Sequence, residues 1–135
     1  MPSDRAENDR APAAKKVLDV GQCGTDHWSV RRLIEGSFAA KVLAADDARA
    51  ALDELRHAPF DLVLVNRRLD SDGSDGLEIV RAIKADPQLA AVPVMLVTNF
   101  PEYQNQAIAA GAVPGFGKAE LHQPHVRELL AKYLR

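Results

Sequence analysis

Residues 61–80 read DLVLVNRRLDSDGSDGLEIV, an apolar run, then an acidic loop, then an amphipathic segment. The run 62–65 is typical of a strand that is buried on both faces of a parallel sheet. In the loop, Gly73 predicts a turn with positive φ, and Asp75 predicts the N-cap of a helix. We therefore expect a strand that ends at Asn66, then an elongated turn, then a helix.

The same alternation of β-type runs and helical patterns extends over most of the chain. It is typical of an α/β domain in which helices cover both faces of a parallel sheet. The expected strands are residues 16–21, 40–44, 60–66, 92–98 and 113–116. The expected helices lie between Asp26 and Gly36, after a cap at Asp46 or Asp47, from Asp75 to before Pro87, from Pro101 to Gly111, and from about Pro124.

The composition limits the possible classes of protein. A chain of 135 residues is long enough for one ordinary domain and too short for two. Its formal charge of −2 gives no electrostatic reason to expect nucleic-acid binding, and no apolar run is long enough to span a membrane. Residues 1–14 lack the apolar stretch of a secretory signal, so we expect a disordered leader followed by a cytoplasmic domain over residues 15–135. The single cysteine, Cys23, excludes an intramolecular disulfide.

The segments FDLVLVN, DGLE, VPVMLVT and AGAVPGFGK follow one another between residues 60 and 118. In order and spacing they resemble the CheY-like receiver domain of bacterial response regulators, over about residues 15–135. The resemblance implies a flavodoxin-like, doubly wound sheet of five parallel strands in the order 2-1-3-4-5. In such a sheet, ligands bind beyond the carboxyl ends of the strands.

The residues that would carry the chemistry of this family are missing. A phosphorylatable receiver has two acids after the first strand and an Asp at the end of the third, which bind Mg²⁺ and accept a phosphoryl group. The matching positions here are Gly21, Gln22 and Asn66, which have no carboxylate. We therefore expect a pseudo-receiver that has no metal or cofactor, is not an enzyme, and does not undergo Mg²⁺-dependent aspartyl phosphorylation.

Two other pocket residues match the family pattern. Thr98 matches the hydroxyl residue that senses the phosphoryl group, and Lys118 matches the lysine that neutralises its charge. Ala119 stands where a proline usually follows this lysine, and Gly115 stands at a switch position where many receivers carry an aromatic residue. Part of the family's readout is therefore missing as well.

The lysine needs a substitute partner, because burying an ammonium group without a counter-charge would cost several kcal/mol or depress its pKa. We predict that Lys118 bonds to Asn66 or to one of three nearby acids, Asp26, Asp70 and Asp72. The same acids support an alternative hypothesis, in which one of them is the non-standard phosphoacceptor of a phosphorelay.

Several motifs have two interpretations. The loop at residues 70–76 departs at three positions from an EF-hand calcium loop, which favours an elongated turn over a metal site. Cys23 and His27 could ligate a soft metal, but two ligands are too few, and Asp26 could equally well cap the first helix. Asp19 stands inside the first strand, where an apolar residue is expected, and indicates either a register offset or a local partner.

Arg67 and Arg68 directly follow the third strand. With Lys118 and Thr98 they could form a site for a small anionic ligand, which is a further alternative. We favour the interpretation in which both guanidinium groups point outward, to solvent or to the acids at positions 70 and 72.

With no effector domain on the chain, we expect output to pass through another signalling protein, such as a histidine kinase, a regulator or an effector. By the resemblance, the partner face would include Phe100, Tyr103, Gln104, His122 and His125. We expect a stand-alone module that is monomeric or a weak homodimer and that contacts neither nucleic acid nor membrane.

Overall fold

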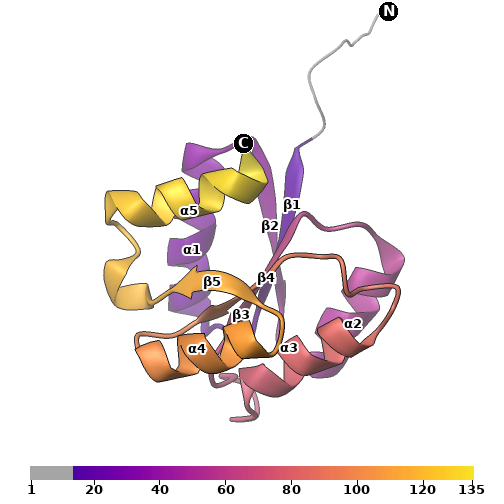
Figure 1. The fold of residues 1–135 in the computed structure, drawn as a ribbon. Helices are drawn as coiled ribbons and strands as arrows, with labels where there is room; N and C mark the ends of the chain where they lie inside the picture. Colours follow the sequence, from indigo (N-terminus) through magenta and orange to yellow (C-terminus); the bar gives the residue numbers. More distant parts are fainter. Residues whose placement is uncertain (1–13) are drawn as a thin grey trace, which may run out of the picture.

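A parallel sheet with helices on both faces forms the domain (Figure 1). The structure is a computed structural model and describes residues 14–135, so the expected leader lies outside the described residues except for its last member. The strands are β1 (Lys15–Val20), β2 (Ala40–Ala45), β3 (Leu62–Asn66), β4 (Val94–Val97) and β5 (Val113–Phe116). The strand order, β2-β1-β3-β4-β5, confirms the predicted α/β fold.

The helices follow the strands in strict alternation. They are α1 (Gly24–Ser37), α2 (Ala48–His57), α3 (Gly76–Ala85), α4 (Pro101–Ala109) and α5 (Pro124–Leu134), and a short 3₁₀ helix, η1 (Lys118–Glu120), precedes α5. Within residues 14–135, no helix combines the length and the apolar composition that crossing a membrane requires.

Some boundaries differ from the prediction for local reasons. Helix α1 begins two residues before the expected Asp26, because Cys23 is its N-cap and the Cys23 Sγ accepts the Asp26 backbone N–H at 3.5 Å. Strand β4 begins at Val94 instead of two residues earlier. The Lys84 ammonium group donates to the carbonyl oxygen of Val92 at 2.7 Å and holds that segment in the preceding loop.

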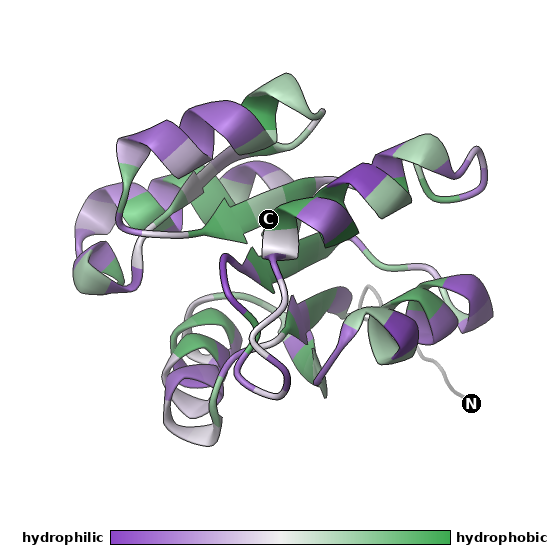
Figure 2. Ribbon diagram, turned by 90° about the horizontal axis from the view of Figure 1, so that it is seen from below, coloured by the Kyte–Doolittle hydropathy of each residue, from purple (hydrophilic) through white to green (hydrophobic). Residues whose placement is uncertain are grey.

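The sheet separates two hydrophobic cores. One is formed with α2, α3 and α4, and the other with α1 and α5. Figure 2 shows the hydrophobic residues concentrated on the strands, while the helices also carry hydrophilic ones. Alternate residues of β1 serve different cores, with Leu18 and Val20 in one and Val17 in the other. Because side chains alternate along a strand, Asp19 is turned toward α1 and α5.

The sheet register brings the carboxyl ends of the central strands to one edge. Val20 of β1 lies opposite Val65 of β3, and Asn66 lies opposite Val97 of β4. The residues that follow these positions are therefore neighbours, although the sequence separates them widely.

Candidate functional site

The predicted pocket residues meet at this edge of the sheet. Gly21 and Gln22 follow β1, Asn66 ends β3, Thr98 follows β4 and Lys118 follows β5. The Asn66 side-chain amide donates to the Gly21 carbonyl oxygen at 3.3 Å, which ties β3 to the turn after β1. The same amide donates to the Arg68 carbonyl oxygen at 2.8 Å.

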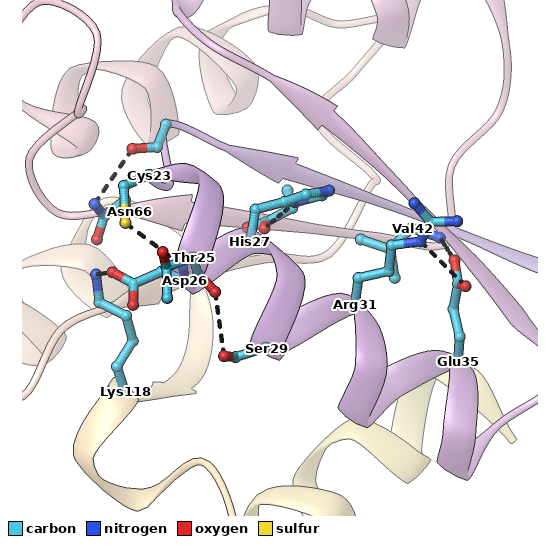
Figure 3. A network of polar contacts seen from close by, with 12 residues as sticks. Cys23, Thr25, Asp26, His27, Ser29, Arg31, Glu35, Val42, Asn66 and Lys118 are labelled. Atoms are coloured by element: carbon cyan, nitrogen blue, oxygen red, sulfur yellow. Dashed lines mark hydrogen bonds and ion pairs between the residues drawn. The ribbon is translucent and has the colours of Figure 1, made fainter.

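Lys118 has an acidic partner in the pocket. Its Nζ donates to Asp26 Oδ2 at 2.7 Å, which joins the loop after β5 to the first turn of α1 (Figure 3). Both side chains are about one third exposed, at 32% for the lysine and 38% for the aspartate. Mainly through this hydrogen bond, Lys118 lowers the pKa of Asp26 below its ordinary value. The prediction that Lys118 takes a substitute partner is confirmed, and among the four candidates that partner is Asp26.

The acidic loop after β3 is a turn, as predicted. Asp72 accepts the backbone N–H of Ser74 at 2.9 Å and its hydroxyl at 2.6 Å, and Gly73 adopts a φ of +71°. Asp75 caps α3 by accepting the Leu77 N–H at 3.0 Å. Asp70 and Asp72, the other two acids predicted as possible partners of Lys118, are exposed, and neither of them bonds to it.

The turn after β1 has no room for a side chain at its first position. Gly21 adopts a φ of +80°, and a Cβ added there would lie 2.5 Å from the Leu69 Cγ. The neighbouring Gln22 is 9% exposed, and within the described residues neither polar atom of its amide has a hydrogen-bond partner. This turn is therefore uncharged and closely packed.

A hydrogen-bonded pair of titratable side chains, His27 and the buried Asp19, lies behind the pocket and explains the polar residue in β1. The His27 Nδ1 lies 2.7 Å from Asp19 Oδ2, and the Asp19 side chain is fully buried. Burial raises the pKa of Asp19, and the bond to His27 opposes that rise. The bond to Asp19 raises the pKa of His27, while partial burial opposes it. Of the two predicted explanations for Asp19, a local partner is the one that holds.

Cys23 and His27, the two candidate ligands for a soft metal, both have partners within the protein. His27 directs Nδ1 at Asp19, while the Cys23 Sγ accepts the Asp26 backbone N–H. Within residues 14–135, no group of three His, Cys, Asp or Glu side chains is arranged to hold a metal ion. The alternative in which Asp26 caps α1 is wrong, because the cap is Cys23.

The expectation that both guanidinium groups point outward, to solvent or to the acids at positions 70 and 72, is wrong for Arg67. The Arg67 Cζ lies 3.9 Å from the centre of the Tyr103 ring, in a cation–π contact that turns it toward α4. Arg68 is exposed, as expected, and donates to the carbonyl oxygen of Gly73 in the acidic loop at 3.0 Å. A cavity of about 400 Å³ lies beside them. It is lined by Asn66, Arg67, Arg68, Val97, Thr98, Asn99, Phe100, Tyr103 and Lys118.

A glutamine on α4 fills the switch position. The Gln104 amide donates to the Leu96 carbonyl oxygen at 2.8 Å and accepts the Gly115 N–H at 3.0 Å. It bridges β4 and β5 where their pairing register shifts. A Cβ at Gly115 would lie 2.4 Å from the Leu96 oxygen, so glycine leaves the space that this bridge requires. Sequence reasoning missed the bridge, although a glycine inside a strand signals a close approach of this kind.

The loop that carries Lys118 is held by two further bonds. The Ala119 N–H donates to Asn99 Oδ1 at 3.0 Å, and the Gly117 N–H donates to Glu120 Oε1 at 3.0 Å. A proline at position 119 could not make the first of these bonds, because it has no N–H. The departure from the family pattern thus adds a contact to the loop.

The five predicted partner-face residues divide into two groups. Phe100 is 58% exposed, His122 is exposed, and the exposed His125 lies 3.1 Å from Glu120 Oε2 through its Nε2. Tyr103 is partly buried beneath Arg67, and Gln104 is engaged with backbone groups of the sheet. The structure thus leaves three of the five well placed for contact with another molecule.

The sequence profile of the response regulator receiver domain matches residues 26–132. The chain belongs to this receiver family. It is 29% identical over 83 residues to the chemotaxis protein CheY of Pseudomonas aeruginosa, covering 62% of this chain and 65% of that protein. It is 30% identical over 106 residues to the Fimbriae Z protein of Salmonella typhimurium, covering 75% of this chain and 47% of that protein. The chain therefore spans less than two thirds of either relative.

Structural comparison agrees with the family. The receiver superimposes on the chemotaxis protein CheY4 of Vibrio cholerae with a TM-score of 0.68 and 26% identity, covering 89% of this chain and 95% of that one. The protein is thus a receiver domain of the two-component response regulators. Within this receiver, the pocket holds Gly21, Gln22 and Asn66 together with an ion pair between Lys118 and Asp26.

The contact between His27 and Asp19 predicts that the free energy of unfolding of the receiver falls as the pH rises. In the folded state the pKa of His27 is raised above the unfolded value of about 6.5. Protonated His27 therefore stabilises the fold fully below about pH 6.5, and this stabilisation is lost as the pH rises through the folded pKa. Urea unfolding at a series of pH values, with NMR titration of the His27 ring, measures both quantities. Asp19→Asn should bring the pKa of His27 down and flatten the curve in this window. An equal pH dependence in the variant would contradict the assignment.

The Gln104 bridge predicts that replacing Gln104 destabilises the receiver more than replacing Gln106, a second glutamine of α4. Gln104→Ala should lower the free energy of unfolding by about 1–3 kcal/mol, because it removes two bonds to backbone groups. Gln106→Ala, at an exposed position of α4, is the matched control and should change it little. Gly115→Ala should also destabilise, because its methyl group meets the Leu96 oxygen. Equal urea midpoints for the two glutamine variants would refute the bridge.

Proposed function

We propose that this protein is a pseudo-receiver, a signalling module that binds another protein and does not undergo Mg²⁺-dependent aspartyl phosphorylation. The observation that carries the proposal is the ion pair between Lys118 and Asp26, at 2.7 Å, in a pocket whose three family acid positions are uncharged. In this proposal the protein is not an enzyme and needs no cofactor.

The pocket is poorly suited to a divalent cation and to an acyl phosphate. Magnesium is held mainly by carboxylates and dehydrates reluctantly. Gly21 has no side chain, Gln22 is buried beside β1, and the Asn66 amide donates to two carbonyl oxygens. An amide is also a poor nucleophile, so attack on a phosphoryl group would need another residue.

The acids that remain are not good substitutes. Asp26 is bonded to the lysine that would otherwise neutralise a phosphoryl group, and Asp72 accepts two bonds from Ser74. Asp70 is exposed on the turn after β3, where its backbone N–H donates to the Gly21 carbonyl oxygen at 2.9 Å. These contacts support the pseudo-receiver over a phosphoacceptor with a non-standard Asp.

The internal contacts also support a single output conformation. Lys118 is satisfied by Asp26, and its loop is held through Asn99. Helix α4 is bonded to β4 and β5 through Gln104. In this proposal the surface that meets the partner is formed without a phosphoryl signal. The partner is another signalling protein of the two-component systems, a histidine kinase, a regulator or an effector.

Incubation of the whole chain with acetyl phosphate and Mg²⁺ tests the proposal. Intact-mass measurement should show no added phosphoryl group, because no carboxylate is placed to bind the metal and accept the group. The double variant Gln22→Asp with Asn66→Asp returns two of the three acids and is the matched comparison. It should gain a phosphoryl group if the missing carboxylates are the cause.

A stable gain of one phosphoryl group by the natural sequence would overturn the pseudo-receiver. In that case Asp26→Asn, Asp70→Asn and Asp72→Asn, each tested alone, would show which acid accepts it. If only Asp26→Asn abolished the gain, Asp26, the partner of Lys118, would be the phosphoacceptor.

A second candidate function, binding of a small anion, is favoured by one observation. Among the described residues the buried Arg67 Nε has no hydrogen-bond partner, and it belongs to a residue that lines the 400 Å³ cavity together with Lys118. Phosphate, sulfate or a nucleotide held there should raise the thermal midpoint with concentration, since a ligand that binds only the folded state stabilises it. The shift should disappear in Arg67→Met. No shift with any of these anions would refute this function.

A further inference from the structure

Two neighbouring hollows, together called the α1–α5 groove, lie along α1 and α5 on the face of the sheet that these two helices cover. Their volumes are about 430 and 580 Å³, and Ser37 is the lining residue that they share. The lining residues recur at helical spacing: positions 28, 32 and 36 on α1 and positions 124, 127 and 131 on α5. Figure 1 shows the two helices on the same side of the sheet.

An exposed aromatic side chain stands at one end of this α1–α5 groove. Trp28 is 57% exposed, and the guanidinium of Arg32 lies 5.1 Å from its ring centre. Solvent exposure of so large an apolar ring is unfavourable, and tryptophan is enriched among residues that anchor protein interfaces. The cation–π contact helps to hold the ring in place, so little side-chain freedom is left to be lost on binding.

Each of the two hollows has a small residue in its lining, Gly36 in one and Ala131 in the other. Gly36 is exposed, and a Cβ added there would meet nothing within 4 Å. Ala131 faces the groove from α5. Small residues on neighbouring helices allow a third helix to approach closely, and the helical spacing of the lining gives ridges against which such a helix can pack.

The charges of the groove differ from those of the whole chain. Three arginine side chains line it, Arg32, Arg127 and Arg135, against one glutamate, Glu128. The complete sequence has a formal charge of −2, so positive side chains are concentrated here. Complementary charge steers association and selects partners, and this groove is complementary to an acidic surface.

We propose that the α1–α5 groove binds an amphipathic helix of a partner protein, with its apolar stripe on Trp28 and its acidic side chains facing Arg32 and Arg127. The inference rests on the proposed function, protein binding, and names the chemistry of the partner. A second copy of the chain fits less well. Helix α4, which carries the exposed apolar Ile108, has one acidic residue, Glu102, and cannot present acids on both sides of a stripe.

Trp28 is the only tryptophan of the sequence, so its fluorescence reports directly on the groove. The whole chain is titrated with two synthetic helical peptides of about 18 residues, which share one leucine stripe and differ only in flanking residues, Glu in one and Lys in the other. The Glu peptide should give a saturable change in emission that weakens at about 0.5 M salt, and the Lys peptide should give none.

Three variants locate the binding. Arg32→Glu should weaken binding of the Glu peptide about tenfold or more. Arg49→Glu makes the same charge change at an exposed position of α2, across the sheet, and should have little effect on binding. Gly36→Leu should block the groove without unfolding the domain, because its Cβ meets open space and leucine favours a helix more than glycine does. Circular dichroism confirms that each variant is folded.

The proposal is overturned if the Glu peptide gives no change, if both peptides bind equally, or if Gly36→Leu binds as the natural chain does. An emission change that depends on the concentration of the chain alone would instead indicate a second copy in the groove and would also overturn it. The outcome is independent of the acetyl phosphate experiment: a chain that gains a phosphoryl group and still binds the Glu peptide refutes the pseudo-receiver and leaves the groove intact.

Discussion

An ammonium group at the carboxyl edge of a parallel sheet needs an anion beside it, and the origin of that anion determines how this pocket can be used. Here the anion is Asp26, which is 92 residues from Lys118 in the chain and reaches it from the first turn of α1. The pair is too exposed to contribute more than about 1 kcal/mol to stability. Its importance is that it satisfies the lysine from within the protein, at the place where an external anion would otherwise bind.

The surroundings of this pair are held by side chains that bond to backbone groups. Asn99 bonds to the loop that carries the lysine, Gln104 bonds α4 to two strands, and Asn66 bonds to the turn after β1. Each bond fixes one element relative to another, and none depends on a ligand. Together these separate bonds hold the pocket and α4 in one arrangement that is set when the chain folds.

Much of the fold and part of the site could be predicted from the sequence. The stretch at residues 61–80 carries its own strand, turn and cap signals, and charge balance indicated that Lys118 would bond to Asn66 or to one of three acids. Contacts made across elements were missed because local patterns do not encode them. The Gln104 bridge depends on a register shift between β4 and β5. Arg67, which follows β3, turns toward Tyr103 because α4 packs on β4, the strand that pairs with β3. Asp19 and His27 meet because α1 folds back over β1, a contact that the sequence left as one of two explanations.

Gly21 limits which pocket positions can acquire an acidic side chain by a single substitution. An acid can be placed at Gln22 or Asn66 by one replacement, since both positions already carry side chains. At Gly21 the backbone conformation disfavours any side chain, and Leu69 occupies the space that one would need. A carboxylate could be accommodated there only if a second residue changed with it and the turn adopted another conformation. Descendants of this sequence can therefore vary the neutral pocket by single steps, whereas assembly of the full acidic set requires coupled substitutions.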